Sequence, residues 1–341
     1  MSLPFSSDPR LSALHDWLAT LADTPVLPGS LRAASADASF RRYFRVDTLD
    51  GATHIVMDAP PSQENVRPFI AVAELFGATG VSVPKVLAQD TERGFLLLSD
   101  LGNVTYLQQL NADTAHALYI DALEALVRIQ VHSEPEVLPE YDRALLLREL
   151  MLFPEWYVGR HLGATMTSAQ QASLDAVFDA LLANNLAQGQ VYVHRDYHSR
   201  NLMVIAPGNP GILDFQDAVY GPVTYDLVSL LRDAYIEWDE EMVLDWAIRY
   251  WELARRAGLP VAPDIDTFYR DFEFMGVQRH LKVLGIFARL YHRDGKEAYL
   301  KDLPLVMNYV RKAAGRYKAL KPLVLLLDAL EGSAPQVGYT F

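Results

Sequence analysis

The sequence predicts an α+β fold in which a small lobe rich in β-strands precedes a larger, mainly helical lobe. Two observations support this order: apolar segments bounded by turn residues lie before Gly102, and segments with helical periodicity dominate after it. No internal repeat and no linker rich in Pro, Gly or Ser divides the chain further. We therefore expect a β-rich lobe over residues 1–101 and a helical lobe over residues 102–341.

Composition narrows the class of protein. The chain has 341 residues, of which 50% are hydrophobic and 21% charged, with no cysteine and a formal net charge of −13. The missing cysteines exclude disulfides and thiolate metal sites, and the acidic excess argues against nucleic acid as the main partner. No apolar run approaches the roughly 18 residues of a membrane span, and the segment after Met1 lacks the pattern of a secretory signal. We expect a cytoplasmic monomer without a membrane span, whose partner is a small molecule.

The elements of each lobe follow from apolar spacing and from cap and turn residues. Asp8 and Pro9 predict the start of a helix, and Asp50-Gly51 predicts a turn between two strands. In the small lobe we expect a helix from Pro9, strands over 40–46 and 54–57, a helix over 66–77, and strands over 81–87 and 94–98. In the large lobe we expect helices from Asp113, over 141–153, over 168–186, from about Val223, over 239–256 and over 271–291.

The most informative stretch is a predicted β-hairpin with polar residues at its ends. Residues 202–205 and 212–215 are apolar, and the segment between them has the Pro, Gly and Asn of a turn. Folding the hairpin brings Asn201 opposite Asp214, and their oxygens are the hard ligands that Mg²⁺ prefers. Asp196 lies on the loop that enters the hairpin, where its carboxylate can accept a proton from a hydroxyl. Kinases divide the work among an Asp, an Asn and a second Asp in this way.

The pattern His194-x-Asp196-x-x-x-x-Asn201, followed by Asp214-Phe215, resembles the catalytic core of the aminoglycoside phosphotransferase and choline kinase family. The resemblance implies a bilobal fold similar to that of protein kinases, with ATP and Mg²⁺ as cofactors. It assigns catalysis to Asp196 and metal binding to Asn201 and Asp214, and it makes Asp226 a brace of the catalytic loop. It also implies that the backbone of the hinge binds adenine, and this hinge consists of Leu98, Ser99, Asp100 and Leu101.

Two other interpretations of the same stretch remain open at this point. The polar residues can simply cap a turn and a hairpin. Alternatively, His194, Asp196 and His198 can form an H-x-D-x-H zinc site, since imidazole and carboxylate are ordinary Zn²⁺ ligands. We expect His194 to brace the loop.

The small lobe departs from the family pattern in two places. The Gly-rich phosphate loop is absent, and Ser35, Asp37 and Ser39 stand in its place, so we expect Ser39 and Arg41 to contact the nucleotide. The arginines of this segment can instead belong to a solvated strand face. The Lys of the third strand is also missing, and Met57 occupies its position. An Arg within residues 41–45, Lys85 or the metal must then balance the phosphate charge, and a regulatory pseudokinase remains an alternative.

Segments 153–158 and 276–290, with Met57-Asp58-Ala59-Pro60-Pro61, are similar to one subgroup of the family. Its members are bacterial kinases that phosphorylate the anomeric hydroxyl of N-acetylmuramate and N-acetylglucosamine in cell-wall recycling. The acceptor candidates are Glu155, Trp156 and Arg279: Trp156 can stack on a pyranose and Arg279 can pair a lactyl carboxylate, although both can also be ordinary interface residues. The basic, amide-rich face of 271–291 favours a neutral or anionic acceptor. Choline, homoserine or an aminoglycoside remain alternative acceptors.

Overall fold

The computed structural model describes residues 8–36 and 40–332, which divide between two compact units. The first unit comprises Met1–Gln109 and Arg200–Asp217, and the second comprises Leu110–Ser199 and Ala218–Phe341. The hairpin with Asn201 and Asp214 therefore groups with the amino-terminal strands, whereas Asp196 belongs to the second unit. Which ligand each lobe binds stays a prediction.

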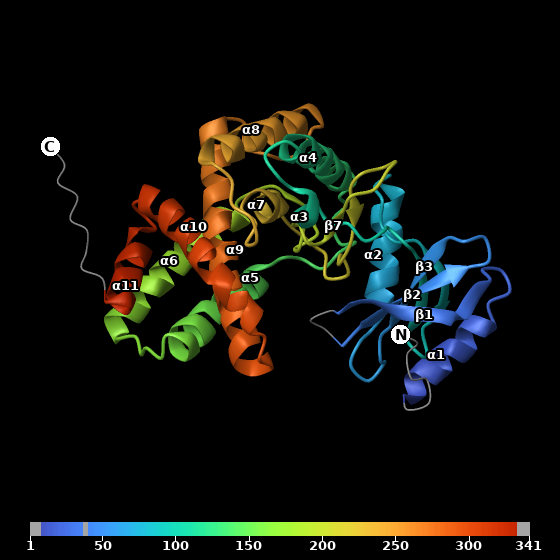
Figure 1. Ribbon diagram of the computed structural model, residues 1–341. Helices are drawn as coiled ribbons and strands as arrows, with labels where there is room; N and C mark the ends of the chain where they lie inside the picture. Colours follow the sequence, from blue (N-terminus) through green and yellow to red (C-terminus); the bar gives the residue numbers. More distant parts are fainter. Residues whose placement is uncertain (1–7, 37–39, 333–341) are drawn as a thin grey trace. The chain divides into compact units, whose positions relative to one another are not determined.

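A five-stranded antiparallel sheet forms the centre of the first unit (Figure 1). Its strand order is β1-β2-β3-β5-β4, and the strands are β1 (Val26–Ala36), β2 (Arg42–Thr48), β3 (Thr53–Asp58), β4 (Val86–Asp90) and β5 (Phe95–Ser99). Strand β1 was not predicted, because Pro28, Gly29 and small polar residues hide its alternation and its pairing with β2 is irregular. The strand predicted over 81–87 begins only at Val86, because Pro84 has no N–H to donate to a ladder.

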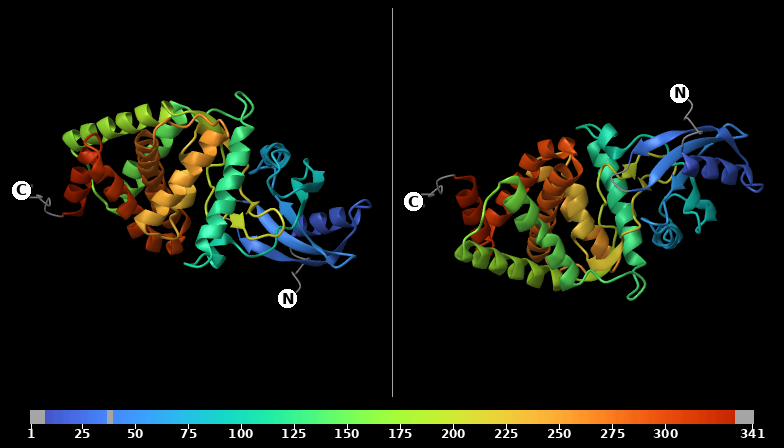
Figure 2. Two further views of the ribbon diagram at one scale, coloured as in Figure 1. Left: turned by 90° about the horizontal axis from the view of Figure 1, so that it is seen from above. Right: turned by 90° about the horizontal axis from the view of Figure 1, so that it is seen from below.

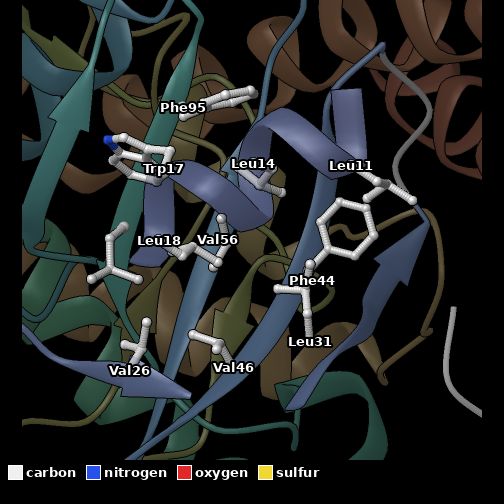
Figure 3. Packing of buried hydrophobic residues seen from close by; sticks show 11 residues of the cluster. Leu11, Leu14, Trp17, Leu18, Val26, Leu31, Phe44, Val46, Val56 and Phe95 are labelled. Carbon is white, nitrogen blue, oxygen red and sulfur yellow. The ribbon is translucent and has the colours of Figure 1, made fainter. Parts of the chain in front are cut away.

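The helix α1 (Pro9–Ala19) begins where the sequence predicts. The Asp8 carboxylate accepts from the N–H groups of Arg10 and Leu11, which caps the helix. The apolar face of α1 packs on one face of the sheet (Figure 3), and the buried cluster consists of Leu11, Leu14, Trp17, Leu18, Val26, Leu31, Phe44, Val46, Val56, Phe95 and Leu97. Arg10 and Arg42 both form ion pairs with the buried Asp58, which ties the helix to strands β2 and β3.

The rest of the first unit surrounds the short hairpin of β7 (Leu202–Met203) and β8 (Gly211–Ile212). The Ile212 N–H donates to Ser82 O at 2.8 Å, and the Val204 N–H donates to Val104 O at 2.8 Å. Phe215 packs its ring against α2 (Arg67–Ala78), with its centroid 4.8 Å from that of Phe69. A short helix, α3 (Tyr106–Gln109), follows the hinge. These contacts fix the hairpin against amino-terminal segments that lie a hundred residues away in the chain.

The second unit is built around the long helix α9 (Ile265–Asp294) (Figure 2). The elements that pack against it include α5 (Arg143–Leu150), the π-helical η1 (Phe153–His161), α6 (Ser168–Leu186), α7 (Tyr225–Leu231), α8 (Glu240–Arg256) and α10 (Leu303–Arg316). A two-stranded sheet, β6 (Gln190–Val193) with β9 (Val219–Pro222), lies next to the loop of residues 194–200, which carries Asp196 and is called the catalytic loop after the family resemblance. The remaining elements of this unit are α4 (Ala115–Val131), η2 (Glu297–Asp302) and α11 (Lys321–Glu331).

Two of these helices differ from the sequence-based expectation in ways that matter for the site. The helix predicted over 141–153 ends at Leu150, and a π-helical segment containing Pro154 follows it, since Pro cannot donate the next helical hydrogen bond. The helix predicted over 271–291 is longer than expected and is not simply amphipathic. Its central residues are buried on all sides, including Gln278, Arg279, His280 and Lys282.

Candidate active site

The hairpin brings the side chains of Asn201 and Asp214 together. Strands β7 and β8 pair Leu202 with Ile212, and the Leu213 N–H donates to Asn201 O at 2.9 Å. This register places Leu213, not Asp214, across from Asn201. Asp214 then adopts a left-handed backbone with φ of 63°, and its Oδ2 lies 3.4 Å from Asn201 Nδ2. The two predicted metal ligands are therefore neighbours within one unit.

The surroundings of Asp214 suit a site that holds a cation and phosphate. Gln216 Nε2 donates to Asp214 Oδ1 at 2.9 Å, and Arg41 Nη2 lies 3.5 Å from the same oxygen. The Asp214 carboxylate and the amide group of Asn201, whose oxygen is a hard donor, are the kinds of ligand that Mg²⁺ binds while it keeps positions for phosphate oxygens. The residues present therefore fit the metal that the sequence predicts.

A cavity of about 390 Å³ in the first unit links this pair to the hinge. Apolar side chains of Ile55, Leu98, Met203 and Leu213 line it, together with the polar pair and Arg200. Its remaining lining consists of Ala34, Tyr43, Arg45, Phe69, Pro84, Ser99, Asp100, Leu101, Gly102, Asn103 and Thr105. An apolar pocket with a few polar groups at one location is the usual form of a small-molecule site.

The hinge is held by the carboxylate of Asp100. Arg45 Nε donates to it at 2.5 Å, Thr53 Oγ1 at 2.7 Å, and the Gly102 N–H at 2.9 Å. Burial raises the pKa of Asp100, but the hydrogen bonds from Arg45 and Thr53 outweigh it, so the pKa is lowered. The Asp100 side chain thus shapes the turn, while the hinge segment from Leu98 to Leu101 lines the cavity.

The arginines of the segment 41–45 have different partners. Arg42 pairs with Asp8 and Asp58, and Arg45 pairs with Asp100. Arg41 is the member of this group that lies against Asp214. Lys85 is exposed and does not line the cavity. Asp37 and Ser39, which stand where the phosphate loop is expected, lie outside the described residues.

Two buried carboxylates hold the backbone of the catalytic loop in the second unit. Asp226 accepts from the His194 N–H at 2.6 Å and from the Arg195 N–H at 3.0 Å, the kind of contact that the resemblance assigns to it. Asp233 accepts from the Ser199 N–H at 2.9 Å. Sequence reasoning missed Asp233, which lies beyond the end of α7 (Tyr225–Leu231), so that no helical spacing relates it to Asp226.

The buried His194 lies within this loop and accepts the Asp196 N–H through Nδ1, at 3.2 Å. Because this nitrogen accepts a backbone hydrogen bond, the ring supports the loop in the way that the sequence predicts for a bracing residue. The zinc alternative finds no support, since no three His, Asp or Glu side chains among residues 8–36 and 40–332 form a group able to hold a metal ion.

Asp196 is buried beside a cluster of cations. Burial raises its pKa, but the charges of Lys282, His198 and Arg279 outweigh burial, so the pKa falls below its usual value. Lys282 is itself held by Glu149, whose Oε1 lies 2.9 Å from Nζ. The carboxylate of Asp196 is therefore ionised at neutral pH, as a group that accepts a proton must be.

The three acceptor candidates do not gather at one point. Arg279 lies on α9 near the catalytic loop, whereas Glu155 is exposed on η1 and acts electrostatically on Arg289. Ten residues of α-helix separate Arg279 from Arg289, which is about 15 Å. Trp156 is partly buried on the same η1 segment as Glu155. Contact of one acceptor with Arg279, Glu155 and Trp156 together stays a prediction.

Comparison with known proteins places the chain in a family. A family model described as the phosphotransferase enzyme family matches residues 30–259, which is more than half of the chain. The chain belongs to this phosphotransferase family. Family membership confirms the resemblance predicted from the catalytic motif. It also implies a phosphotransfer reaction with a small-molecule acceptor that uses ATP and a divalent metal ion.

Curated relatives match nearly the whole length of the chain. The N-acetylmuramate/N-acetylglucosamine kinase of Neisseria meningitidis serogroup B is 53% identical over 337 residues, which cover 97% of this chain and 99% of the relative. The kinase of the same name from Pseudomonas putida is 52% identical, and the match covers 94% of each chain.

Solved structures establish the fold. Choline kinase LicA from Streptococcus pneumoniae matches 88% of this chain and 98% of its own, with a TM-score of 0.62 at 13% identity. An ADP-bound aminoglycoside phosphotransferase matches 87% and 97%, with a TM-score of 0.55 at 14% identity. The predicted α+β, protein-kinase-like fold is thereby confirmed. Within the described part of the chain, every helix is too short or too polar to cross a membrane.

Proposed function

We propose that this chain is an ATP-dependent kinase that phosphorylates the anomeric hydroxyl of N-acetylmuramate and N-acetylglucosamine in cell-wall recycling. The observation that carries the proposal is the 53% identity, over 97% of the chain, to a kinase named for these two sugars. The Asn201–Asp214 pair and the loop with Asp196 supply the groups that such a reaction needs. We also propose that the protein acts as a cytoplasmic monomer, which light scattering would test against its mass of 38.2 kDa.

In this proposal the first unit binds the nucleotide. The hinge from Leu98 to Leu101 contacts adenine, and Ser39 and Arg41 contact the phosphates. Mg²⁺ bound by Asn201 and Asp214 would neutralise phosphate charge during transfer. Arg41 takes over the charge of the missing strand Lys, because it is the arginine of its segment that lies against Asp214.

The second unit supplies the base and the acceptor site. Asp196 orients the acceptor hydroxyl and takes its proton as the bond from the hydroxyl oxygen to the γ-phosphorus forms and the bond to ADP breaks. A carboxylate with a lowered pKa is a weak base. An anomeric hydroxyl suits it, since a hemiacetal hydroxyl is more acidic than an ordinary alcohol. Asp226 and Asp233 hold the loop backbone that positions Asp196.

The direct test is ADP release from Mg·ATP with each of the two sugars, followed by phosphorus NMR of the product. We expect a sugar phosphorylated at the anomeric oxygen, and a loss of turnover of at least about 100-fold in Asp196→Asn. Near-full turnover of this variant with saturating substrates would disprove the role of Asp196. Turnover of choline, homoserine or an aminoglycoside but of neither sugar would disprove the acceptor. Nucleotide binding without any turnover would indicate a pseudokinase.

A further inference from the structure

Arg279 is a buried cation with unmade hydrogen bonds. It lies in the middle of α9 with only 4% of its surface exposed, and its Nε and Nη1 atoms are buried without a partner. Leaving a charged donor buried and unpaired costs free energy. A ligand group that accepts hydrogen bonds from this guanidinium would therefore be stabilised in the site.

Other interior arginines of the same unit have carboxylate partners. Arg232, which is 3% exposed, donates to Glu273 Oε1 at 3.1 Å, and Arg195 donates to Glu149 Oε1 at 2.5 Å. The chain thus neutralises guanidinium groups that serve only its own fold. Arg279 differs from both, because among the described residues it forms no ion pair with a carboxylate, and both its Nε and its Nη1 are buried without a partner.

Glu149 is the buried acid that contacts this region, and its oxygens already have hydrogen-bond partners. Glu149 is buried and accepts from Arg195, from Lys282 Nζ at 2.9 Å and from the Tyr141 hydroxyl. Lys282, one helical turn after Arg279, also donates to the Tyr225 hydroxyl at 2.9 Å. The positive charge of Lys282 is therefore balanced inside the protein.

Packing and charge both associate Arg279 with the loop that carries Asp196. α9 packs against α7, which carries Asp226, and Glu149 contacts both Arg195 of the loop and Lys282, three residues after Arg279. Burial raises the pKa of Asp196, while the charges of Lys282, His198 and Arg279 lower it. Burial also raises the pKa of Asp226, and the Arg279 charge acts in the opposite direction. An acceptor whose hydroxyl reaches Asp196 thus brings other substituents of its ring into the region of Arg279. The two sugars in the names of the relatives differ in one such substituent, since N-acetylmuramate carries a lactyl ether with a carboxylate and N-acetylglucosamine has a free hydroxyl there.

We propose that Arg279 binds the carboxylate of the acceptor and makes the protein prefer the carboxylated sugar to the neutral one. A guanidinium fork matches a carboxylate in shape and charge. The inference rests on the proposed function, and it adds a group that selects between the two acceptors. It assigns no part of the selection to Glu155, which lies near Arg289.

The first test changes the acceptor and leaves the protein intact. Wild-type kcat/KM is measured with N-acetylmuramate and with its uncharged carboxamide at the same Mg·ATP concentration. A charge-assisted hydrogen bond predicts a preference of about 10- to 100-fold for the acid, carried mainly by KM. Equal kcat/KM for acid and amide would overturn the inference and leave the proposed function standing. Absence of turnover with N-acetylmuramate, its amide and N-acetylglucosamine would overturn the proposed function itself.

The second test changes the protein. In Arg279→Gln we expect the ratio of kcat/KM for N-acetylmuramate to kcat/KM for N-acetylglucosamine to fall by about 10- to 100-fold, because any effect on Asp196 is common to both sugars. Turnover of the neutral sugar also reports that the variant is folded. Arg270→Gln, on the exposed part of the same helix, is the matched control and should change neither value. Equal losses with both sugars would mean that Arg279 only positions the catalytic loop or contacts the transferred phosphoryl group, and would overturn the proposal.

Discussion

At the residue scale, the sequence predicts candidates for the chemical groups of the site more readily than the residues that hold those groups in place. Asp196, Asn201 and Asp214 follow from a short motif whose spacing has a chemical reason. Asp233 does not, because its partners are the N–H and the hydroxyl of Ser199, which lies 34 residues earlier in the chain, and no local pattern marks that contact. The burial of Arg279 was also hidden, since a basic residue within a periodic segment usually indicates a solvated face.

The raised pKa of Asp226, which accepts hydrogen bonds from the catalytic loop, predicts that the stability of the protein depends on pH. Burial raises the pKa of Asp226 to about 7. A carboxyl whose pKa is raised on folding contributes stability that is complete below its unfolded pKa of 3.8 and is lost as pH rises through about 7. The free energy of unfolding of the wild type, relative to Asp226→Asn, should therefore fall between pH 4 and pH 8, by as much as about 4 kcal/mol. Urea titrations across this range measure it, and a pH-independent difference would show that Asp226 stays ionised.

The position of Arg41 predicts a role in nucleotide affinity. Arg41 Nη2 lies 3.5 Å from Asp214 Oδ1, beside the proposed metal ligands. In Arg41→Gln we expect KM for Mg·ATP to rise by about 10-fold or more, with KM for the sugar unchanged, because a charge-assisted contact to phosphate is lost. Arg32→Gln is the control, since Arg32 pairs with Asp47 on an exposed part of the same sheet. An unchanged KM for Mg·ATP would indicate that the metal alone balances the phosphate charge in the absence of the strand Lys.

At the element scale, helices with strong periodicity were predictable and elements that depend on distant partners were not. α6 has the predicted bounds, Ser168–Leu186, because Thr167 and Gln170 form a capping box at its start. β1 has no such local signal, and its residues form a strand because β2 pairs with them. The short hairpin was visible from its turn residues, but its neighbours Ser82 and Val104 were not.

The close approach of α9 to Leu152, the residue before η1, predicts that a larger side chain at position 285 would clash. A Cβ at Gly285 would lie 2.4 Å from the carbonyl carbon and 2.5 Å from the carbonyl oxygen of Leu152, and backbone atoms cannot move aside cheaply. Gly285→Ala should therefore lower the free energy of unfolding by about 1–3 kcal/mol and lower the melting temperature. In Gly315→Ala, on α10, the new methyl meets nothing within 4 Å, so this control should be neutral or slightly stabilising. Equal stability of the two variants would contradict the close approach of α9 and η1.

At the scale of the whole chain, the most consequential feature is the grouping of residues 200–217 with residues 1–109. Chain order cannot show this, because the hairpin follows the catalytic loop directly in sequence. It joins the first unit through backbone hydrogen bonds to Ser82 and Val104. The proposed metal ligands Asn201 and Asp214 thereby share one cavity with the hinge, while the proposed base Asp196 belongs to the other unit.

This division predicts that nucleotide binding and proton transfer can be separated by mutation. The cavity is lined by residues of the first unit, including Asp214 and Asn201. Mg·ADP should therefore raise the melting temperature of wild type and of Asp196→Asn by a similar few degrees at about 100 times the dissociation constant. It should give little or no shift in Asp214→Asn, and chelating the metal should reduce the shift in wild type and in Asp196→Asn. If Asp196→Asn lost the shift as completely as Asp214→Asn, the base would be needed for nucleotide binding as well. The prediction that nucleotide binding and proton transfer belong to different units would then be wrong.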